Sequence, residues 1–198
     1  MLKTPMTTSQ TNDQVFIGID LGGTTVKGAL VTPAGEILHE VRVDTEQRNS
    51  DRLLEQIIET IHILRSDDRA GARAVAVGIG IPGLVNLKTK RIEVMPNLPP
   101  LSDVDVITEL SRQSGLPVTI DNDANAAAYA ELMAGAARGR RDVFFVTLGT
   151  GIGSGLIIDG KIYRGATGFA GEFGHMTIDP EGIECGCGNI GCLETIAS

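Results

Sequence analysis

The stretch Ile-Asp-Leu-Gly-Gly-Thr-Thr-Val-Lys at residues 19–27 decides the fold class, because a similar stretch occurs a second time in the chain. Residues 147–153 are Thr-Leu-Gly-Thr-Gly-Ile-Gly, and each copy joins one apolar run to another through a glycine turn. Apolar runs on both sides of a short glycine turn predict an antiparallel hairpin. The repetition predicts an internal duplication, with each hairpin opening its own α/β unit.

The residues between and after the two stretches predict the other elements of each unit. The expected strands are 15–20, 25–32, 36–43, 74–79, 117–120, 142–148, 155–158 and 161–163. The expected helices are 51–65, 103–114, with Ser102 as N-cap, and 124–137. We therefore expect a polar, disordered tail over 1–14, a first α/β domain over 15–138 and the start of a second domain over 139–198.

Composition excludes several classes of function. The net charge is −8 and the sequence pI is about 4.9, which argues against a surface for nucleic acid or anionic membranes. The chain has no apolar run long enough to span a membrane, and the N-terminal residues do not resemble a secretory signal. Three cysteines lie in one short stretch, which favours thiols or metal ligands over disulfides. We expect a cytoplasmic protein.

The two glycine stretches are candidate phosphate-binding loops. Glycine at a hairpin tip lets backbone N–H groups approach phosphate oxygens, and the threonine hydroxyls add donors. Asp20, at the end of the strand before the first turn, could hold Mg²⁺ directly or through water. A plain hairpin that uses glycine for its positive φ angle is the alternative for either stretch alone. Because a triphosphate must be held from two sides, the pair favours nucleotide binding.

Asp121-Asn122-Asp123-Ala124-Asn125 lies where a predicted strand leads into a helix. A carboxylate at the positive end of that helix would lie at the mouth of a cleft. Capping of the helix by Asn or by one of the Asp residues is the alternative. Two carboxylates beside an asparagine exceed the needs of a cap, so we expect at least one of them to be functional.

The most specific pattern is Glu172-x-Gly-His175 followed by Cys185-x-Cys187-Gly-x-x-Gly-Cys192-x-Glu194. One histidine and three cysteines form a Cys₃His set, which suits tetrahedral Zn²⁺. Four protein ligands leave no position for a catalytic water, so the zinc is expected to be structural. His39 and His62 have no such neighbours in the sequence and are expected at the surface.

These motifs resemble the ROK family of bacterial sugar kinases and sugar-responsive repressors, and especially its glucokinases, over residues 15–198. The resemblance implies an α/β chain of the actin-like, ribonuclease-H-like ATPase fold, built from duplicated βββα units of which the second is incomplete. It implies binding of ATP with Mg²⁺ at the two glycine stretches, and a structural Zn²⁺. The residues implied for ATP are Asp20, Gly22, Gly23, Thr24, Thr25, Lys27, Gly149, Thr150, Gly151 and Gly153. Those implied for zinc are His175, Cys185, Cys187 and Cys192.

The resemblance also implies a hexose substrate, with glucose converted to glucose 6-phosphate and Asp123 as the general base. The implied sugar contacts are Gly83, Asn122, Asp123, Glu172, His175 and Glu194. Family members continue for about another 100 residues, so we expect a fragment whose second sheet exposes apolar surface and whose own activity is weak. A homodimer is expected for the full-length form.

Three alternatives stay open. Another hexose, such as N-acetylmannosamine, fructose or allose, could be the substrate, because one contact can decide specificity. The chain could bind sugar and zinc without catalysis. A repressor of the same family is a third alternative, although the residues before Asp20 are too few for a helix-turn-helix and the charge is acidic.

Overall fold

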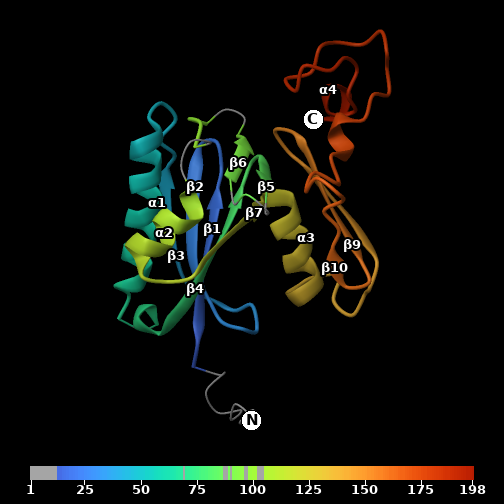
Figure 1. Ribbon diagram of the computed structural model, residues 1–198. Coiled ribbons are helices and arrows are strands. Elements are labelled where there is room, and N and C mark those ends of the chain that lie inside the picture. Colours follow the sequence, from blue (N-terminus) through green and yellow to red (C-terminus); the bar gives the residue numbers. More distant parts are fainter. Residues whose placement is uncertain (1–12, 69, 87–88, 90, 96–97, 102–104) are drawn as a thin grey trace. The chain divides into compact units, whose positions relative to one another are not determined.

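The chain forms two units, residues Met1–Asp121 and Asn122–Ser198 (Figure 1). The computed structural model describes residues 13–68, 70–86, 89, 91–95, 98–101 and 105–198. The tail expected over 1–14 thus lies almost wholly outside the described residues. The division falls before helix α3 (Asp123–Ala134), whereas the sequence placed it after that helix. The reason is that α3 packs against strands of the second unit.

A five-stranded sheet forms the centre of the first unit. Its strands run in the order β3-β2-β1-β4-β7. Their bounds are β1 (Val15–Leu21), β2 (Thr25–Val31), β3 (Ile37–Asp44), β4 (Ala74–Ile81) and β7 (Val118–Asn122). The first three strands are antiparallel, as the short connections predicted, and β4 pairs with β1 in parallel. A separate hairpin joins β5 (Leu84–Asn86) to β6 (Arg91–Val94).

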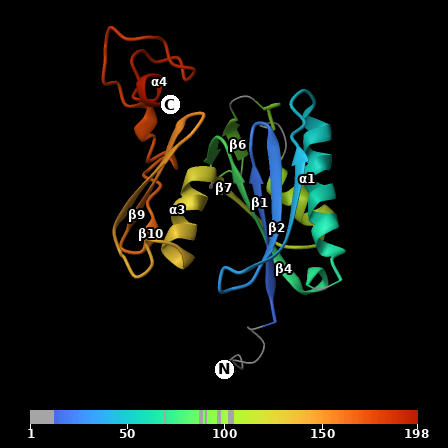
Figure 2. The ribbon, with the colours of Figure 1, turned by 180° about the vertical axis from the view of Figure 1, so that it is seen from behind.

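Helices α1 (Ser50–Arg65) and α2 (Val106–Ser114) contact each other (Figure 1; α1 also in Figure 2). Both contribute buried side chains to the core of this unit. Asn49 caps α1 by accepting the Arg52 N–H, and Asp105 caps α2 by accepting the Thr108 N–H. The described part of α2 thus begins later than the predicted 103, and Ser102, the expected cap, lies outside the described residues. Among the described residues, no helix combines the length and apolar character of a membrane span.

Side chains of β1 alternate between two environments. Ile17 and Ile19 are buried in the core, whereas Phe16 and Asp20 lie on the other face and are exposed. Opposite Ile19, Gly28 lies directly beneath α1: an added Cβ would be 2.8 Å from Thr60 Cγ2 and 2.9 Å from Leu64 Cδ1. The absence of a side chain at residue 28 therefore sets how closely α1 approaches the sheet.

The second unit repeats the start of the first. Strands β8 (Val143–Leu148), β9 (Ile152–Ile158) and β10 (Lys161–Ile162) form an antiparallel sheet in the order β10-β9-β8. This matches β3-β2-β1, as the duplication predicted. Helix α3 packs on β9 and β8, and an added Cβ on Gly155 would lie only 2.6 Å from Ala128 Cβ. A 3₁₀ turn η2 (Phe173–His175) and helix α4 (Glu194–Ala197) follow.

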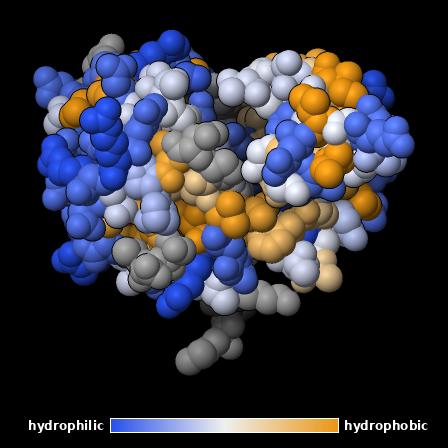
Figure 3. Space-filling view, turned by 90° about the horizontal axis from the view of Figure 1, so that it is seen from above, coloured by the Kyte–Doolittle hydropathy of each residue, from blue (hydrophilic) through white to orange (hydrophobic). Residues whose placement is uncertain are grey.

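One face of β8 exposes apolar side chains. Phe144, Val146 and Leu148 alternate along the strand and are 52%, 37% and 73% exposed. In the face shown in Figure 3, hydrophobic residues reach the surface among hydrophilic ones. The expectation that the second sheet exposes apolar surface is therefore confirmed.

The packing of α1 on the sheet yields a matched test. Gly28→Ala forces a methyl group against Thr60 and Leu64, so we expect a loss of about 1–3 kcal/mol in the free energy of unfolding. Gly18→Ala, on the neighbouring strand, meets no atom within 4 Å and should change stability by about 0.5 kcal/mol or less. Urea denaturation of both variants provides the measurement. Equal stability of the two variants would contradict the close approach of α1.

Candidate active site and metal centre

The junction between β7 and α3 places the predicted catalytic carboxylate in the first turn of a helix. Asn122 is the N-cap, and its Oδ1 accepts the N–H of Asn125 at 3.1 Å. The cap is thus the asparagine and neither of the two aspartates. Asp123 follows as the first helical residue, half-buried, and its Oδ1 accepts the Ala124 N–H at 2.8 Å. The helix terminus stabilises the negative charge of this carboxylate.

The segment that carries Glu172 and His175 is attached to strand β9. The Ser154 hydroxyl donates to the Gly171 carbonyl and accepts the Phe173 N–H at 3.3 Å. Gly171 has φ 99°, a conformation that favours glycine and turns the chain just before Glu172. Phe173 packs edge-on against Phe144 of β8, with ring centroids 5.1 Å apart. These contacts fix the positions from which Glu172 and His175 project.

Four of the predicted sugar-binding residues interact electrostatically. Burial raises the pKa of the Glu172 carboxyl, His175 opposes the rise, and the negative charges of Asp123 and Glu194 add to it. His175 Nε2 lies 3.9 Å from Glu172 Oε2. Three carboxylates and one imidazole thus converge within the second unit, although they are up to 71 positions apart in the chain, from residue 123 to residue 194.

The predicted metal ligands are also brought together. The ligand atoms of His175, Cys185, Cys187 and Cys192 all lie within 4.8 Å of one another. Cys187 Sγ is 3.7 Å from Cys192 Sγ, and Cys185 Sγ is 3.6 Å from His175 Nδ1. An ideal tetrahedron around zinc separates two sulfurs by about 3.8 Å and a sulfur from a nitrogen by about 3.5 Å. The donor set and its spacing therefore fit a tetrahedral zinc ion.

The buried residues of the loop that carries the cysteines are mainly the cysteines themselves. The structure describes all of residues 163–198. Apart from glycines, Cys185 and Cys192 are the buried residues of this segment, at 4% and 0% exposure. Burial raises the pKa of the Cys192 thiol to about 11, while a backbone hydrogen bond from Asn189 lowers the pKa of Cys187. A thiolate at Cys192 therefore requires a compensating positive charge, which a metal cation supplies.

The first glycine turn, in the other unit, is held by the end of β3. Gly22 N–H donates to the Thr25 carbonyl at 3.0 Å, and the Thr45 hydroxyl donates to the Gly22 carbonyl at 2.7 Å. Gln47 Nε2 donates to the Gly23 carbonyl at 2.6 Å. Neither glycine has a positive φ angle, and a Cβ on Gly23 would meet nothing within 4 Å. Neither backbone strain nor packing therefore explains why residue 23 is glycine. Close approach of a ligand to the backbone is a remaining explanation.

Asp20 and Lys27 lie opposite each other at the base of this turn. Asp20 Oδ2 and Lys27 Nζ are 3.2 Å apart, and both side chains are about half exposed. A single accessible carboxylate fits Mg²⁺ that keeps most of its water and phosphate ligands.

The second glycine stretch combines one open position with two crowded ones. Gly149 has ordinary φ and open space around an added Cβ, as Gly23 does. A Cβ on Gly151 would lie 2.5 Å from Glu194 Oε2, and one on Gly153 would lie 2.8 Å from Thr147 Oγ1 and 3.1 Å from Ala124 Cβ. Packing against Thr147 and Ala124 thus accounts for Gly153, whereas a side chain at residue 151 would displace the Glu194 carboxylate.

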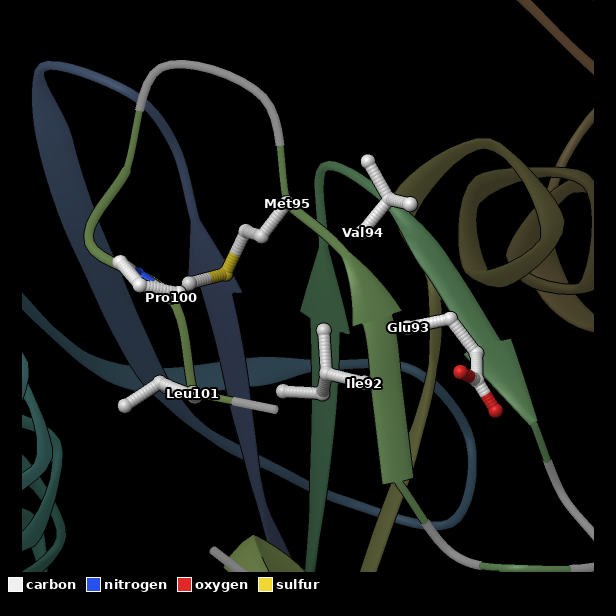
Figure 4. Close-up of a pocket in the computed structure, with 6 residues that line it drawn as sticks. All are labelled: Ile92, Glu93, Val94, Met95, Pro100 and Leu101. Atoms are coloured by element: carbon white, nitrogen blue, oxygen red, sulfur yellow. The ribbon is translucent and has the colours of Figure 1, made fainter. Parts of the chain in front are cut away.

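Gly83 and a small pocket belong to the first unit. A Cβ at Gly83 would collide with the Val94 carbonyl oxygen, so close backbone approach explains this glycine. The pocket is lined by Ile92, Glu93, Val94, Met95, Pro100 and Leu101. Glu93 is the one ionisable residue among them; it points away from Met95, Pro100 and Leu101 and accepts a hydrogen bond from Asn86 at 3.0 Å (Figure 4). This pocket lacks the convergent polar groups of a catalytic site.

Several positioning residues were missed by the sequence analysis. Thr45 and Gln47 hold the first turn, yet no motif contains them. Ser154 holds the Glu172 segment and lies in the glycine-rich run 149–155, but no role was predicted for it. Glu194 was predicted as a sugar contact, but its Oε2 also accepts the Ile152 N–H at 2.8 Å. The one available signal for Thr45 and Gln47 was that they are polar residues just after the end of β3.

Comparison with known proteins identifies the family. Residues 16–198 match the sequence pattern that defines the ROK family. The chain belongs to the ROK family.

Relatives in this family include both enzymes and regulators. The chain is 38% identical to a glucokinase of Halalkalibacterium halodurans over 94% of this chain and 57% of the relative. It is 37% identical to the xylose repressor of Bacillus subtilis, over 92% of this chain and 47% of the relative. The chain thus spans about half the length of these proteins.

A solved ROK structure confirms the fold class. A ROK family glucokinase from Streptomyces griseus, in complex with glucose and AMPPNP, has a TM-score of 0.81 and 38% identity. The match covers 93% of this chain and 57% of that one. The α/β, actin-like fold implied by the sequence is therefore that of the family.

The donor geometry predicts about one zinc ion per chain. His175→Gln removes the nitrogen ligand and should weaken zinc binding at least about a hundredfold. His62→Gln, at an exposed histidine of α1, should bind zinc as the parent protein does. Chelator competition with elemental analysis provides the measurement. Unchanged zinc affinity after His175→Gln would remove the imidazole from the ligand set.

Proposed function

We propose that the gene product containing this chain is an ATP-dependent hexose kinase that converts glucose to glucose 6-phosphate. The observation that carries this proposal is the convergence of Asp123, Glu172, Glu194 and His175 in one unit. A sugar offers several hydroxyl groups, and such a set of acceptors with one imidazole donor suits their recognition.

Asp123 is proposed as the general base. A carboxylate has two oxygens with several acceptor directions, so the bond from the Ala124 N–H leaves capacity for a substrate hydroxyl. Asp123 would take the proton of the 6-hydroxyl as that oxygen attacks the γ-phosphorus of ATP in line. The O–P bond to the sugar forms, the bond to ADP breaks, and the proton ends on the Asp123 carboxylate.

The two glycine turns are proposed to hold the phosphates of ATP. Support comes from Gly23 and Gly149, where neither φ nor packing requires glycine. Backbone N–H groups that face the phosphates stabilise the charge that develops during transfer. Asp20 would hold Mg²⁺, which when bound neutralises phosphate charge.

The Cys₃His cluster is proposed to be structural. His175 would bind zinc through Nδ1, so that its neutral ring carries the proton on Nε2, the nitrogen that faces Glu172. That N–H can donate to a sugar hydroxyl, and the metal therefore fixes the direction of a sugar contact. Asn122 and Gly83 are proposed as further sugar contacts.

Glucose is favoured as the substrate because glucokinases are among the relatives with 38–40% identity. The xylose repressor relative supports a second candidate, a sugar-binding protein without catalysis. A panel of glucose, N-acetylmannosamine, fructose and allose separates the two, because a kinase consumes ATP with at least one sugar. Sugar binding without ATP consumption would support the second candidate.

The base assignment is tested by Asp123→Asn. The amide retains the oxygen that accepts the Ala124 N–H but cannot take a proton, so turnover should fall by about 10² to 10⁴ while glucose binding persists. Asp159→Asn is the matched control, because Asp159 is exposed and Asn tolerates its φ of 52°. A coupled assay and calorimetry on the gene product measure both quantities. Turnover near that of the parent would exclude Asp123 as the base.

A further inference from the structure

Ile152 joins the second glycine turn to strand β9, and its backbone is held by the metal loop. Its N–H donates to Glu194 Oε2 at 2.8 Å, across 42 positions of sequence. Ile152 is 6% exposed, so this bond is shielded from water. A hydrogen bond to a carboxylate is stronger than one between neutral groups. Glu194, the first residue of α4, thus fixes the backbone of Ile152, which directly follows the glycine turn.

A second contact to Ile152 comes from Gly174. Gly174 is buried against it, and an added Cβ would lie 2.8 Å from Ile152 Cβ and closer still to the Ile152 carbonyl oxygen. Gly174 directly precedes His175, and Glu194 comes two residues after Cys192. Each contact with Ile152 is therefore made beside a predicted metal ligand.

The two segments are themselves joined. Cys192 Sγ lies 3.4 Å from the His175 carbonyl oxygen, and the Leu193 N–H donates to the Met176 carbonyl at 3.0 Å. Glu194 Oε1 lies 3.8 Å from Cys185 Sγ, a third predicted ligand. An ion bound by these ligands would lock the spacing between Gly174 and Glu194.

We propose that zinc in the Cys₃His cluster sets the conformation of the second glycine turn, and that Glu194 transmits this effect as a positioning residue for the turn. The assignment rests on the proposed function only insofar as the turn holds phosphates. Through Oε2, Glu194 aligns the turn, and Oε1 is compatible with the proposed sugar contact. Zinc binding, the loop with the proposed sugar contacts and the second glycine turn are then conformationally coupled.

The test is the exchange rate of the Ile152 amide, measured by NMR on the zinc-loaded gene product. Glu194→Ala should retain zinc, since Glu194 is not a ligand, yet raise Ile152 exchange by about tenfold or more. Glu194→Gln keeps an oxygen acceptor and should recover part of the protection. Glu184→Ala, an exposed carboxylate of the same loop, is the control and should leave exchange unchanged. The Tyr163 amide, bonded to the Leu156 carbonyl, reports any general loss of structure.

Removal of zinc by a chelator should raise Ile152 exchange in the parent while Tyr163 stays protected. Equal Ile152 protection with and without zinc, or no effect of Glu194→Ala, would overturn the proposal. AMPPNP affinity, measured on the same samples, should fall with Ile152 protection. If the protein binds no AMPPNP but Ile152 still follows zinc and Glu194, the coupling stands and the kinase proposal fails.

Discussion

The proximity of one imidazole and three cysteine sulfurs, whose ligand atoms all lie within 4.8 Å of one another, is the constraint on which the proposed account of the second unit depends. The loop between β10 and α4 has a single 3₁₀ turn and two isolated bridges as regular structure, and its large buried side chains are cysteines. A segment without an apolar core needs another source of stability, and the proposed zinc would supply it. Its glycines fit that account, because Gly188 and Gly191 have φ angles of 86° and 67° that place the ligands in tight turns.

The same loop brings functional side chains together that lie far apart in the sequence. His175 Nδ1 lies 3.6 Å from Cys185 Sγ, and His175 Nε2 lies 3.9 Å from Glu172 Oε2. Glu194 accepts the Ile152 N–H of β9 through Oε2, and its Oε1 lies 3.8 Å from Cys185 Sγ. Asp123 joins this group because α3 packs on the sheet from which the loop emerges. A sugar placed among these groups would meet the proposed base, two further carboxylates and the His175 imidazole. Burial raises the pKa of Glu172, and the negative charges of Asp123 and Glu194 add to the rise against the opposing effect of His175. A ligand that donates hydrogen bonds would stabilise these carboxylates.

Much of this arrangement could be predicted from the sequence, because local patterns encode it. The hairpins, α1 and the Cys₃His set follow from residues that lie close together in the chain. The end of α3 did not: its alanine run predicted a helix to residue 137, whereas Gly135 ends it after Ala134. The link between Ile152 and Glu194 could not be predicted, since it joins residues 42 positions apart and no pattern marks it. The roles of Gly151 and Gly153 were likewise invisible, because packing against Glu194 and α3 explains them.

The central claim is that one imidazole joins metal and sugar, and the ring nitrogens of His175 test it most directly. The chain has three histidines, so their ¹⁵N signals are readily resolved by NMR. In the zinc-loaded protein we expect a metal-bound Nδ1 and a protonated Nε2 whose shift changes as glucose is added. Glucose that binds with no change at Nε2, or a proton on Nδ1 in the presence of zinc, would contradict the account.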